Sequence, residues 1–208
     1  IPILGGALIP ILPFKKRNHR LTYMELLVIL NTILVWFLLF HRPEEVLTIL
    51  KFTGNLSVTF HMDGLGMVFA GLISALWPLA TLYSCEYMKH EKHENIFFMF
   101  YTMTYGVTLG ISLSANILSM YFFYELLTLV TTPLVIHAFT REAILATRKY
   151  LYYSLGGAAF AFIGMIFIIV YGISPDFTYG GVLSAENYTG NPNVLLLIYV
   201  LAFLGFSV

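Results

Sequence analysis

The sequence predicts an all-α membrane protein, a polytopic bundle of transmembrane helices of which about seven spans are encoded here. Of the 208 residues, 59% are hydrophobic and only 11% are charged, whereas a soluble domain carries about 25% charged residues. Mean hydropathy is +0.82, and the apolar residues gather in runs of about the length that crosses a bilayer. With 11 basic and 11 acidic residues, the chain also lacks the net positive charge of a nucleic-acid binder.

The apolar runs predict the helices in chain order. One run, Ile96–Thr140, contains Glu125 as its single charged residue. At about 1.5 Å per residue it is too long for one crossing, so it predicts two helices with a turn around residues 112–116. The first run is also compatible with a signal peptide, but no basic region precedes it and further spans follow. The predicted spans are Ile1–Phe14, which is short, Leu21–Phe40, Met62–Ser84, the pair within Ile96–Thr140, Leu151–Tyr171, and a seventh that begins in Val194–Val208.

The loops predict the orientation of these spans. Nine of the 11 basic residues fall in loops on one side, while Arg42 and Lys51 fall on the other. Basic loops stay in the cytoplasm, so the N-terminus is expected outside, in a multi-pass protein of a bacterial or archaeal plasma membrane. The nine residues are Lys15, Lys16, Arg17, Arg20, Lys89, Lys92, Arg141, Arg148 and Lys149.

Two outer connections and several small residues add detail. The loop His41–Phe60 contains an apolar cluster over residues 46–50, which predicts a short interfacial helix. The loop Gly172–Asn193 is rich in glycine and proline and predicts an irregular external connection. Small residues at helical spacing predict close packing among spans four to six. They are Gly106, Gly110, Gly157, Ala161 and Gly164.

Glu125 is the main functional candidate. It follows Asn116 by nine residues, which places it roughly 13 Å deep, near the middle of a hydrocarbon core about 30 Å thick. A carboxylate at that depth costs about 2.5–3.5 kcal/mol. The cost falls when the group is protonated or faces a cation, so its proton occupancy depends on its surroundings. The alternative is a protonated side chain that only hydrogen-bonds a neighbouring helix.

Further candidates lie on the same predicted helix. Tyr121, Thr128 and Thr132 share a face with Glu125, where they would hold water or join helices by hydrogen bonds. Pro133 is expected to break the helical hydrogen-bond ladder, either opening a hydrated gap or making a passive kink.

Three other groups lie near the expected cytoplasmic side. His137 follows Glu125 by twelve residues, about 18 Å along a helix, and is either a proton-entry group or an interfacial histidine. Lys149 opens the predicted sixth span as a headgroup anchor or as an inner partner of the acidic pathway. A group of potential ligands is expected to form a solvated loop without a metal. That group is His90, Glu91, His93 and Glu94.

Two motifs resemble those of the antiporter-like subunits of respiratory complex I, membrane-bound hydrogenases and Mrp cation/proton antiporters. The run Tyr121–Leu129 (YFFYELLTL) resembles their fifth-span signature. The run Ala146–Leu151 (ATRKYL) resembles the entry to their sixth span, with Leu151 where an aromatic residue is usual. The resemblance implies the N-terminal part of a fold of about fourteen helices with inverted repeats. Residues 1–60 would be peripheral, and residues 61–208 would begin the first ion-translocating repeat.

The resemblance also implies a function and partners. Glu125 would carry protons and pair with a lysine expected directly after Val208. We expect a proton-translocating subunit of a redox-driven respiratory or hydrogenase-type complex, with no catalytic residue, cofactor or redox chemistry of its own. Its partners would be other membrane subunits, some antiporter-like, and peripheral Fe–S or flavin subunits. The alternatives are a subunit of an Mrp-type Na⁺/H⁺ antiporter and a non-transporting scaffold.

Overall fold

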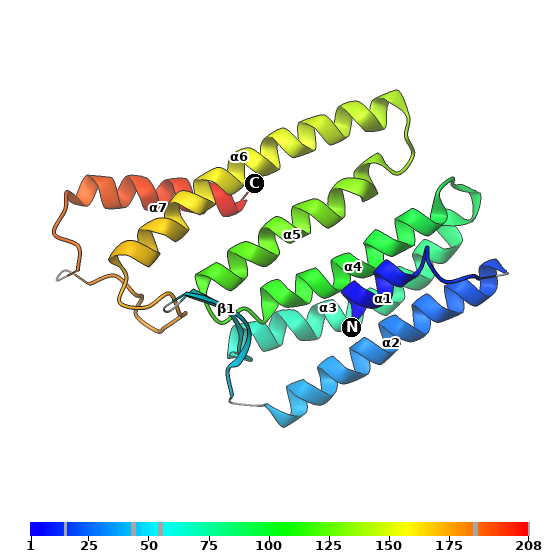
Figure 1. Cartoon of the computed structure of the whole chain (residues 1–208), viewed down its shortest axis with the longest axis horizontal. Helices are drawn as coiled ribbons and strands as arrows, with labels where there is room; N and C mark the ends of the chain where they lie inside the picture. Colours follow the sequence, from blue (N-terminus) through cyan, green and yellow to red (C-terminus); the bar gives the residue numbers. More distant parts are fainter. Residues whose placement is uncertain (15, 43–44, 54–55, 185–186, 208) are drawn as a thin grey trace.

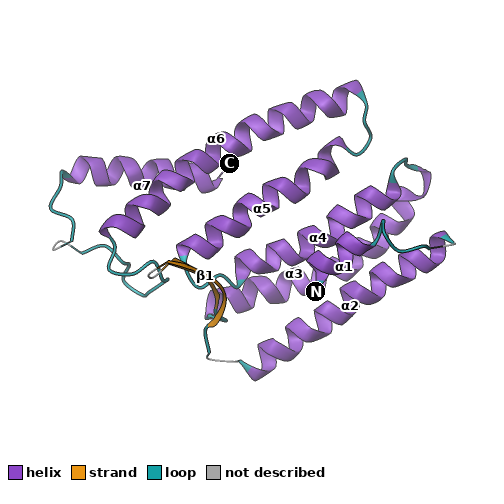
Figure 2. Cartoon of the chain, in the orientation of Figure 1, coloured by secondary structure: helices purple, strands orange, loops and turns teal. Residues whose placement is uncertain are grey.

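The computed structural model describes residues 1–14, 16–42, 45–53, 56–184 and 187–207. It is a helical bundle with one β-hairpin, so the predicted all-α membrane class is confirmed (Figures 1 and 2). Among the described helices, α2, α3, α5 and α6 are long and apolar enough to cross a membrane. Lys15 and Val208 lie outside the described residues. The elements are α1 (Pro2–Leu8), α2 (Arg17–His41), β1 (Leu47–Thr53), β2 (Leu56–Phe60), α3 (Gly64–Tyr87), the 3₁₀ turn η1 (Met88–His90), α4 (Glu94–Ser112), α5 (Ile117–Ile136), α6 (Arg141–Tyr171) and α7 (Pro192–Ser207).

The first apolar run forms only the short helix α1. Pro10 and Pro13 follow it, and a proline lacks the N–H that would continue a helix. The helix packs closely on α4, since a Cβ built on Gly106 would lie 2.8 Å from the Ile3 side chain. The run predicted as a first span is therefore a seven-residue helix resting on α4.

The segment predicted as a short interfacial helix is an antiparallel β-hairpin, so that prediction was wrong. Both strands are rich in β-branched and aromatic residues, among them Ile49, Val58 and Phe60, and such residues favour strands. Val58 and Thr59 of β2 are buried, while the apolar side chains of β1 are exposed. Only β2 of the hairpin thus packs against the neighbouring helices, at the end where α5 begins.

The predicted turn between the fourth and fifth spans is confirmed, because α4 ends at Ser112 and α5 begins at Ile117. Asn116 caps α5, its Oδ1 accepting from the Ser119 N–H at 2.7 Å. The Asn116 amide donates to the Ser57 carbonyl at 2.9 Å, and the Thr59 N–H donates to the Ser119 hydroxyl at 2.8 Å. The hairpin therefore fixes where α5 starts, and with it the depth of every residue on that helix.

Helix α6 begins at Arg141, ten residues before the predicted start of the sixth span. Thr140 caps it by accepting from the Ala143 N–H at 3.1 Å, and Glu142 suits the positive end of the helix dipole. Lys149 consequently lies in the third turn of a 31-residue helix and does not open it.

The small residues pack helices in a different arrangement from the one expected. A Cβ on Gly110 would collide with the Phe123 ring, so Gly110 does bring α4 close to α5. On α6, however, the small residues face α7. A Cβ on Gly205 would lie 2.5 Å from the Gly157 carbonyl oxygen, and one on Gly164 would collide with Ala202.

Candidate functional site

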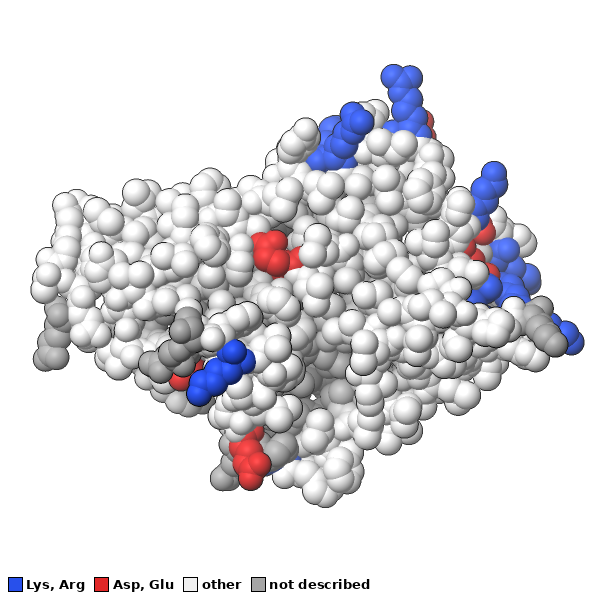
Figure 3. All heavy atoms as spheres, in the orientation of Figure 1, with Lys and Arg blue, Asp and Glu red and all other residues white. Residues whose placement is uncertain are grey.

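Charge is distributed unevenly over the molecule. Lys and Arg gather at one end, where α2 and α4 begin and α5 turns into α6 (Figure 3). A group of acidic atoms lies midway along the same view, over α5, with uncharged residues around it (Figure 3). Glu125 is the single acidic residue of α5.

Glu125 is half-buried, and its Oε1 is buried without a hydrogen-bond partner among the described residues. The described part of the chain also places no cation within ion-pairing distance of it. Because Asn116 caps α5, Glu125 lies nine residues into the helix, or about 13 Å from its outer end. The carboxyl group is therefore deep along an apolar helix and has an unused hydrogen-bonding atom.

Two tyrosines that precede Glu125 on α5 join this helix to its neighbours. The Tyr121 hydroxyl donates to the Ala158 carbonyl of α6 at 3.4 Å. The Tyr124 hydroxyl donates to the Gly205 carbonyl of α7 at 3.2 Å. Glu125 thus lies next to the contacts that hold α5, α6 and α7 together. Tyr124 was not among the predicted site residues, although it directly precedes the glutamate.

The threonines of α5 make different contacts from one another. Thr128 is buried, and its carbonyl accepts from the Thr132 hydroxyl at 2.7 Å, so Thr132 is satisfied within its own helix. Thr131, which the sequence reasoning missed, lies 2.6 Å from the Tyr150 hydroxyl of α6. Tyr150 belongs to the ATRKYL motif, so that motif could have pointed to a contact between α6 and α5.

Lys149 and His137 are not in contact with Glu125. Lys149 is exposed on α6. The Thr131–Tyr150 contact places it about six residues, or 9 Å, along the bundle from Glu125. His137 follows the end of α5, where its Nδ1 lies 2.8 Å from the Leu134 carbonyl oxygen and its ring meets Phe97 edge-on. Any proton transfer between these groups needs intervening water.

Pro133 does not break α5. The helix continues through it to Ile136, and the proline removes one N–H from the ladder without ending the helix. The two alternatives for Pro133, a hydrated gap and a passive kink, both stay predictions.

Glu94, expected in a solvated loop, is the first residue of α4 and is held by two arginines. Its side chain is 13% exposed. Arg17 reaches Oε1 at 2.5 Å and also donates to the Cys85 carbonyl at 2.7 Å, and Arg20 pairs with Oε2. The solvated-loop prediction is wrong for this residue, because partners 77 and 74 positions away fold onto it.

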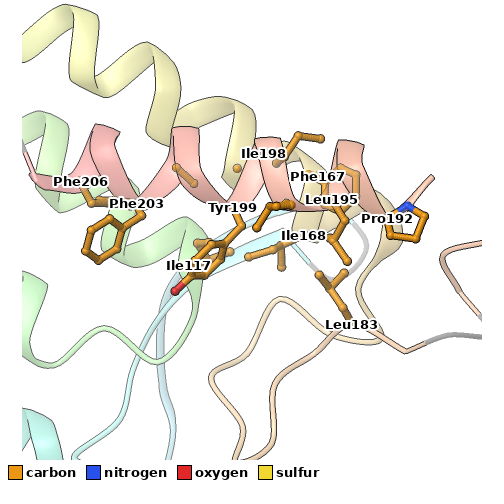
Figure 4. Close-up of a pocket in the computed structure, with 13 residues that line it drawn as sticks. Ile117, Phe167, Ile168, Leu183, Pro192, Leu195, Ile198, Tyr199, Phe203 and Phe206 are labelled. Atoms are coloured by element: carbon orange, nitrogen blue, oxygen red, sulfur yellow. The ribbon is translucent and has the colours of Figure 1, made fainter. Parts of the chain in front are cut away.

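An apolar cavity of about 560 Å³ lies between α7, α6 and the start of α5 (Figure 4). Ile168, Leu195 and Phe203 line it, and Tyr199 supplies the one side-chain oxygen. Glu125 does not line this cavity. The cavity is therefore separate from the candidate site, and its apolar lining offers almost no ligands to an ion.

Comparison with known proteins supports the resemblance. The family described as NADH-Ubiquinone oxidoreductase (complex I), chain 5 N-terminus, matches residues 51–98. The chain is 28% identical to the A-type subunit of the Na(+)/H(+) antiporter of Alkalihalophilus pseudofirmus, covering 98% of this chain and 26% of that protein. It is 27% identical to the A1-type subunit of the Na(+)/H(+) antiporter of Staphylococcus aureus, covering 82% of this chain and 22% of the relative. The chain thus spans about a quarter of the length of these curated relatives.

Two solved structures share the fold. A chain of the Mrp complex from Dietzia sp. DQ12-45-1b aligns with a TM-score of 0.77 at 16% identity, over 99% of this chain and 22% of that one. A chain of the membrane-bound sulfane sulfur reductase, an archaeal respiratory membrane complex, aligns with a TM-score of 0.76 at 16% identity, over 98% of this chain and 42% of that one. The predicted resemblance to the N-terminal part of antiporter-like subunits is confirmed.

Proposed function

We propose that this chain serves an ion-translocating, antiporter-like membrane subunit in which Glu125 carries a proton through the middle of the bilayer. The observation that carries the proposal is the buried Glu125 oxygen, which has no partner among the described residues although the helix around it is apolar. A carboxylate in this state is costly unless it is protonated or faces a cation, so the proton affinity of Glu125 depends on charges that come near it.

The proposed mechanism is electrostatic. At an effective dielectric constant of about 20, a cation moving to within about 8 Å of Glu125 stabilises the carboxylate by roughly 2 kcal/mol. That changes the proton affinity of Glu125 about thirtyfold, so a proton is released when the cation approaches and taken up when it leaves. Lys149 is one candidate cation, and the resemblance implies a second lysine beyond Val208. Tyr121, Thr128 and Thr132 would position water along α5, and His137 would exchange protons at its end.

The comparisons favour an ion gradient over a redox reaction as the energy source, with sodium exchanged for protons. The curated relatives are named as subunits of Na(+)/H(+) antiporters, which favours the Mrp-type alternative over the redox-driven complex expected first. The redox-driven form, with peripheral Fe–S or flavin partners, is kept because a respiratory complex shares the fold. In both forms the chain assembles with other membrane subunits, and the basic end faces the cytoplasm, which places the hairpin end on the outside.

The test is Glu125→Gln in the full-length subunit within its complex, reconstituted into vesicles. We expect Na⁺-dependent pH changes to be lost while the complex assembles normally. Glu142→Gln is the matched control, because Glu142 is an exposed glutamate in the first turn of α6. Exchange at the unsubstituted rate in Glu125→Gln would overturn the proposal. Loss of assembly would instead support the scaffold alternative.

A further inference from the structure

Two open grooves lie between α2 and α3, at the edge of the bundle that α2 forms (Figure 1). The basic-end groove has a volume of about 320 Å³ and the hairpin-end groove one of about 530 Å³. Most of the side chains that line them are apolar. The basic-end groove is lined by Leu21, Thr22, Glu25, Leu26, Leu82 and Cys85.

Both grooves lie on the same side of this helix pair. Five turns of an α-helix contain 18 residues, so side chains that are 18 positions apart leave the helix in the same direction. Leu21 and Leu39 of α2 line opposite grooves at that spacing, as do Leu82 and Gly64 of α3. The exposed Ile29 lies between the grooves on α2. The grooves are therefore the two ends of one stretch along the helix pair, which we call the α2–α3 seam.

The α2–α3 seam has room for another helix to come close. A Cβ built on Gly71 would meet only the Leu39 side chain, at 3.5 Å, and one built on Gly64 would meet nothing within 4 Å. Between α6 and α7 the corresponding atom on Gly164 would collide with Ala202. Small residues are typical of contacts between transmembrane helices. The glycines of the seam are thus not used for packing among the described residues.

Glu25 limits what can fill the seam. It is half-buried, and its Oε2 is buried without a hydrogen-bond partner among the described residues. It lies eight residues after Arg17, where α2 begins, or about 12 Å along the helix. A lipid tail would leave that oxygen unpaired, whereas a basic side chain supplies both a hydrogen bond and the opposite charge. The charge of the seam therefore favours a cationic occupant.

The cations of the described chain do not pair with Glu25. Arg17 and Arg20 both pair with Glu94. The Arg20 Nε is also buried without a described partner, but Arg20 precedes Glu25 by five residues and so lies about 140° away around α2. Arg42 lines the hairpin-end groove, 17 residues and about 26 Å from Glu25 along the helix. A counter-charge for Glu25 has to come from a group outside these ranges.

We propose that a transmembrane helix of another subunit docks in the α2–α3 seam and presents a lysine or arginine to Glu25. An apolar helix would cover both grooves, and its basic residue would meet the one acidic side chain that lines them. The inference takes from the proposed function only that the chain assembles with other membrane subunits. It does not depend on proton transfer by Glu125.

The first test places the photo-crosslinking amino acid benzoylphenylalanine at Leu82, in the full-length subunit within its complex. The matched control is the same probe at Leu30, because the two leucines are similarly exposed, at 56% and 51%, and Leu30 lines neither groove. We expect Leu82 to crosslink to another subunit in higher yield than Leu30 does. Mass spectrometry should place the crosslink in an apolar segment that contains a lysine or arginine.

Three results of this test would overturn the proposal. The first is a crosslink from Leu82 only to lipid or only to another part of the same polypeptide. The second is a crosslinked segment without a basic residue. The third is a yield at Leu82 no higher than at Leu30.

The second test changes Glu25 in the protein that carries the probe at Leu82, with the yield measured per subunit present in the membrane. Glu25→Gln should lower the yield by about tenfold, because losing one partner of a buried pair weakens binding at least that much. Glu25→Asp keeps the charge and should retain most of the crosslink. Thr22→Ala, in the same groove, is the uncharged control and should change nothing. An unchanged yield in Glu25→Gln, or an equal loss in Glu25→Asp, would overturn the pairing.

A charge exchange completes the test once the crosslinked segment is known. Glu25→Lys, combined with glutamate in place of the identified basic residue, should restore the crosslink that each single substitution removes. Failure of the pair to restore it would overturn the assignment of that residue as the partner of Glu25. Glu125→Gln should leave this crosslink intact while it abolishes ion exchange, so the two proposals fail independently.

Discussion

Glu94 and Glu125 differ in whether a positive charge lies beside the carboxylate. Glu94 lies at the start of α4, where Arg17 and Arg20 hold both of its oxygens. Glu125 lies midway along α5, with one buried oxygen that has no partner in the described part of the chain. A carboxylate fixed between two cations keeps its charge, whereas an uncompensated one responds to any charge that moves nearby. The first is held in place by its partners, and the second is the carboxyl group that we propose carries a proton.

The largest effect on stability that this comparison predicts is at Glu94. Glu94→Gln leaves two arginines without a counter-charge, and breaking a largely buried pair costs about 3 kcal/mol. Glu125→Gln should change stability by less than about 1 kcal/mol, because among the described residues Glu125 makes no ion pair and its buried oxygen has no hydrogen-bond partner. The measurement is the free energy of unfolding of the protein in mild detergent. Equal destabilisation by the two substitutions would remove the distinction between them.

The next largest effect is at Asn116, which sets the depth of Glu125. Asn116→Ala removes the cap of α5 and leaves buried hairpin groups unpaired, at an expected cost of about 2 kcal/mol. Asn116→Asp keeps the acceptor of the cap but loses the amide donor, so about half of that loss is expected. An alanine variant as stable as the unsubstituted protein would show that the hairpin does not anchor α5. Thermal unfolding monitored by circular dichroism measures this series.

A smaller effect is expected at the contact between α5 and α6. Tyr150→Phe removes the hydroxyl that lies 2.6 Å from Thr131, at a cost of about 1 kcal/mol. A double-mutant cycle with Thr131→Val isolates the pair, and we expect Tyr150→Phe to cost almost nothing once Thr131 is replaced. An unchanged cost in that background would mean that the two hydroxyls do not interact. Chemical denaturation of the four proteins supplies the energies.

The smallest effect on stability is expected at Lys149, which is exposed and makes no ion pair among the described residues. Lys149→Ala should change the free energy of unfolding by less than about 0.5 kcal/mol. Lys149 is offset from Glu125 by about 9 Å along the bundle axis. If it acts on Glu125, sodium–proton exchange should slow by up to about tenfold. Exchange at the unsubstituted rate, measured in vesicles, would leave Lys149 as a membrane anchor.

Several features were predictable because the bilayer and the helix impose fixed lengths. The apolar runs located the long helices but not the short α1, the polar residues around Asn116 located the turn before α5, and the spacing from that turn placed Glu125 halfway along its helix. The fold class and the resemblance to antiporter-like subunits followed from the same local signals. The tyrosine contacts beside Glu125 did not, since their acceptors are backbone carbonyls that no pattern marks.

The sequence by itself determined the membrane class, the order of the long helices and the place of Glu125 halfway along its helix, because hydrophobicity and helical rise are properties of each segment alone. Only the tertiary structure decided that residues 47–60 pair as a hairpin, that Glu94 is held by Arg17 and Arg20, and that the small residues of α6 face α7. Those outcomes depend on which distant segments come into contact. Side chains that are dozens of residues apart in the sequence interact only after the helices have packed, so no local pattern predicts which of them meet.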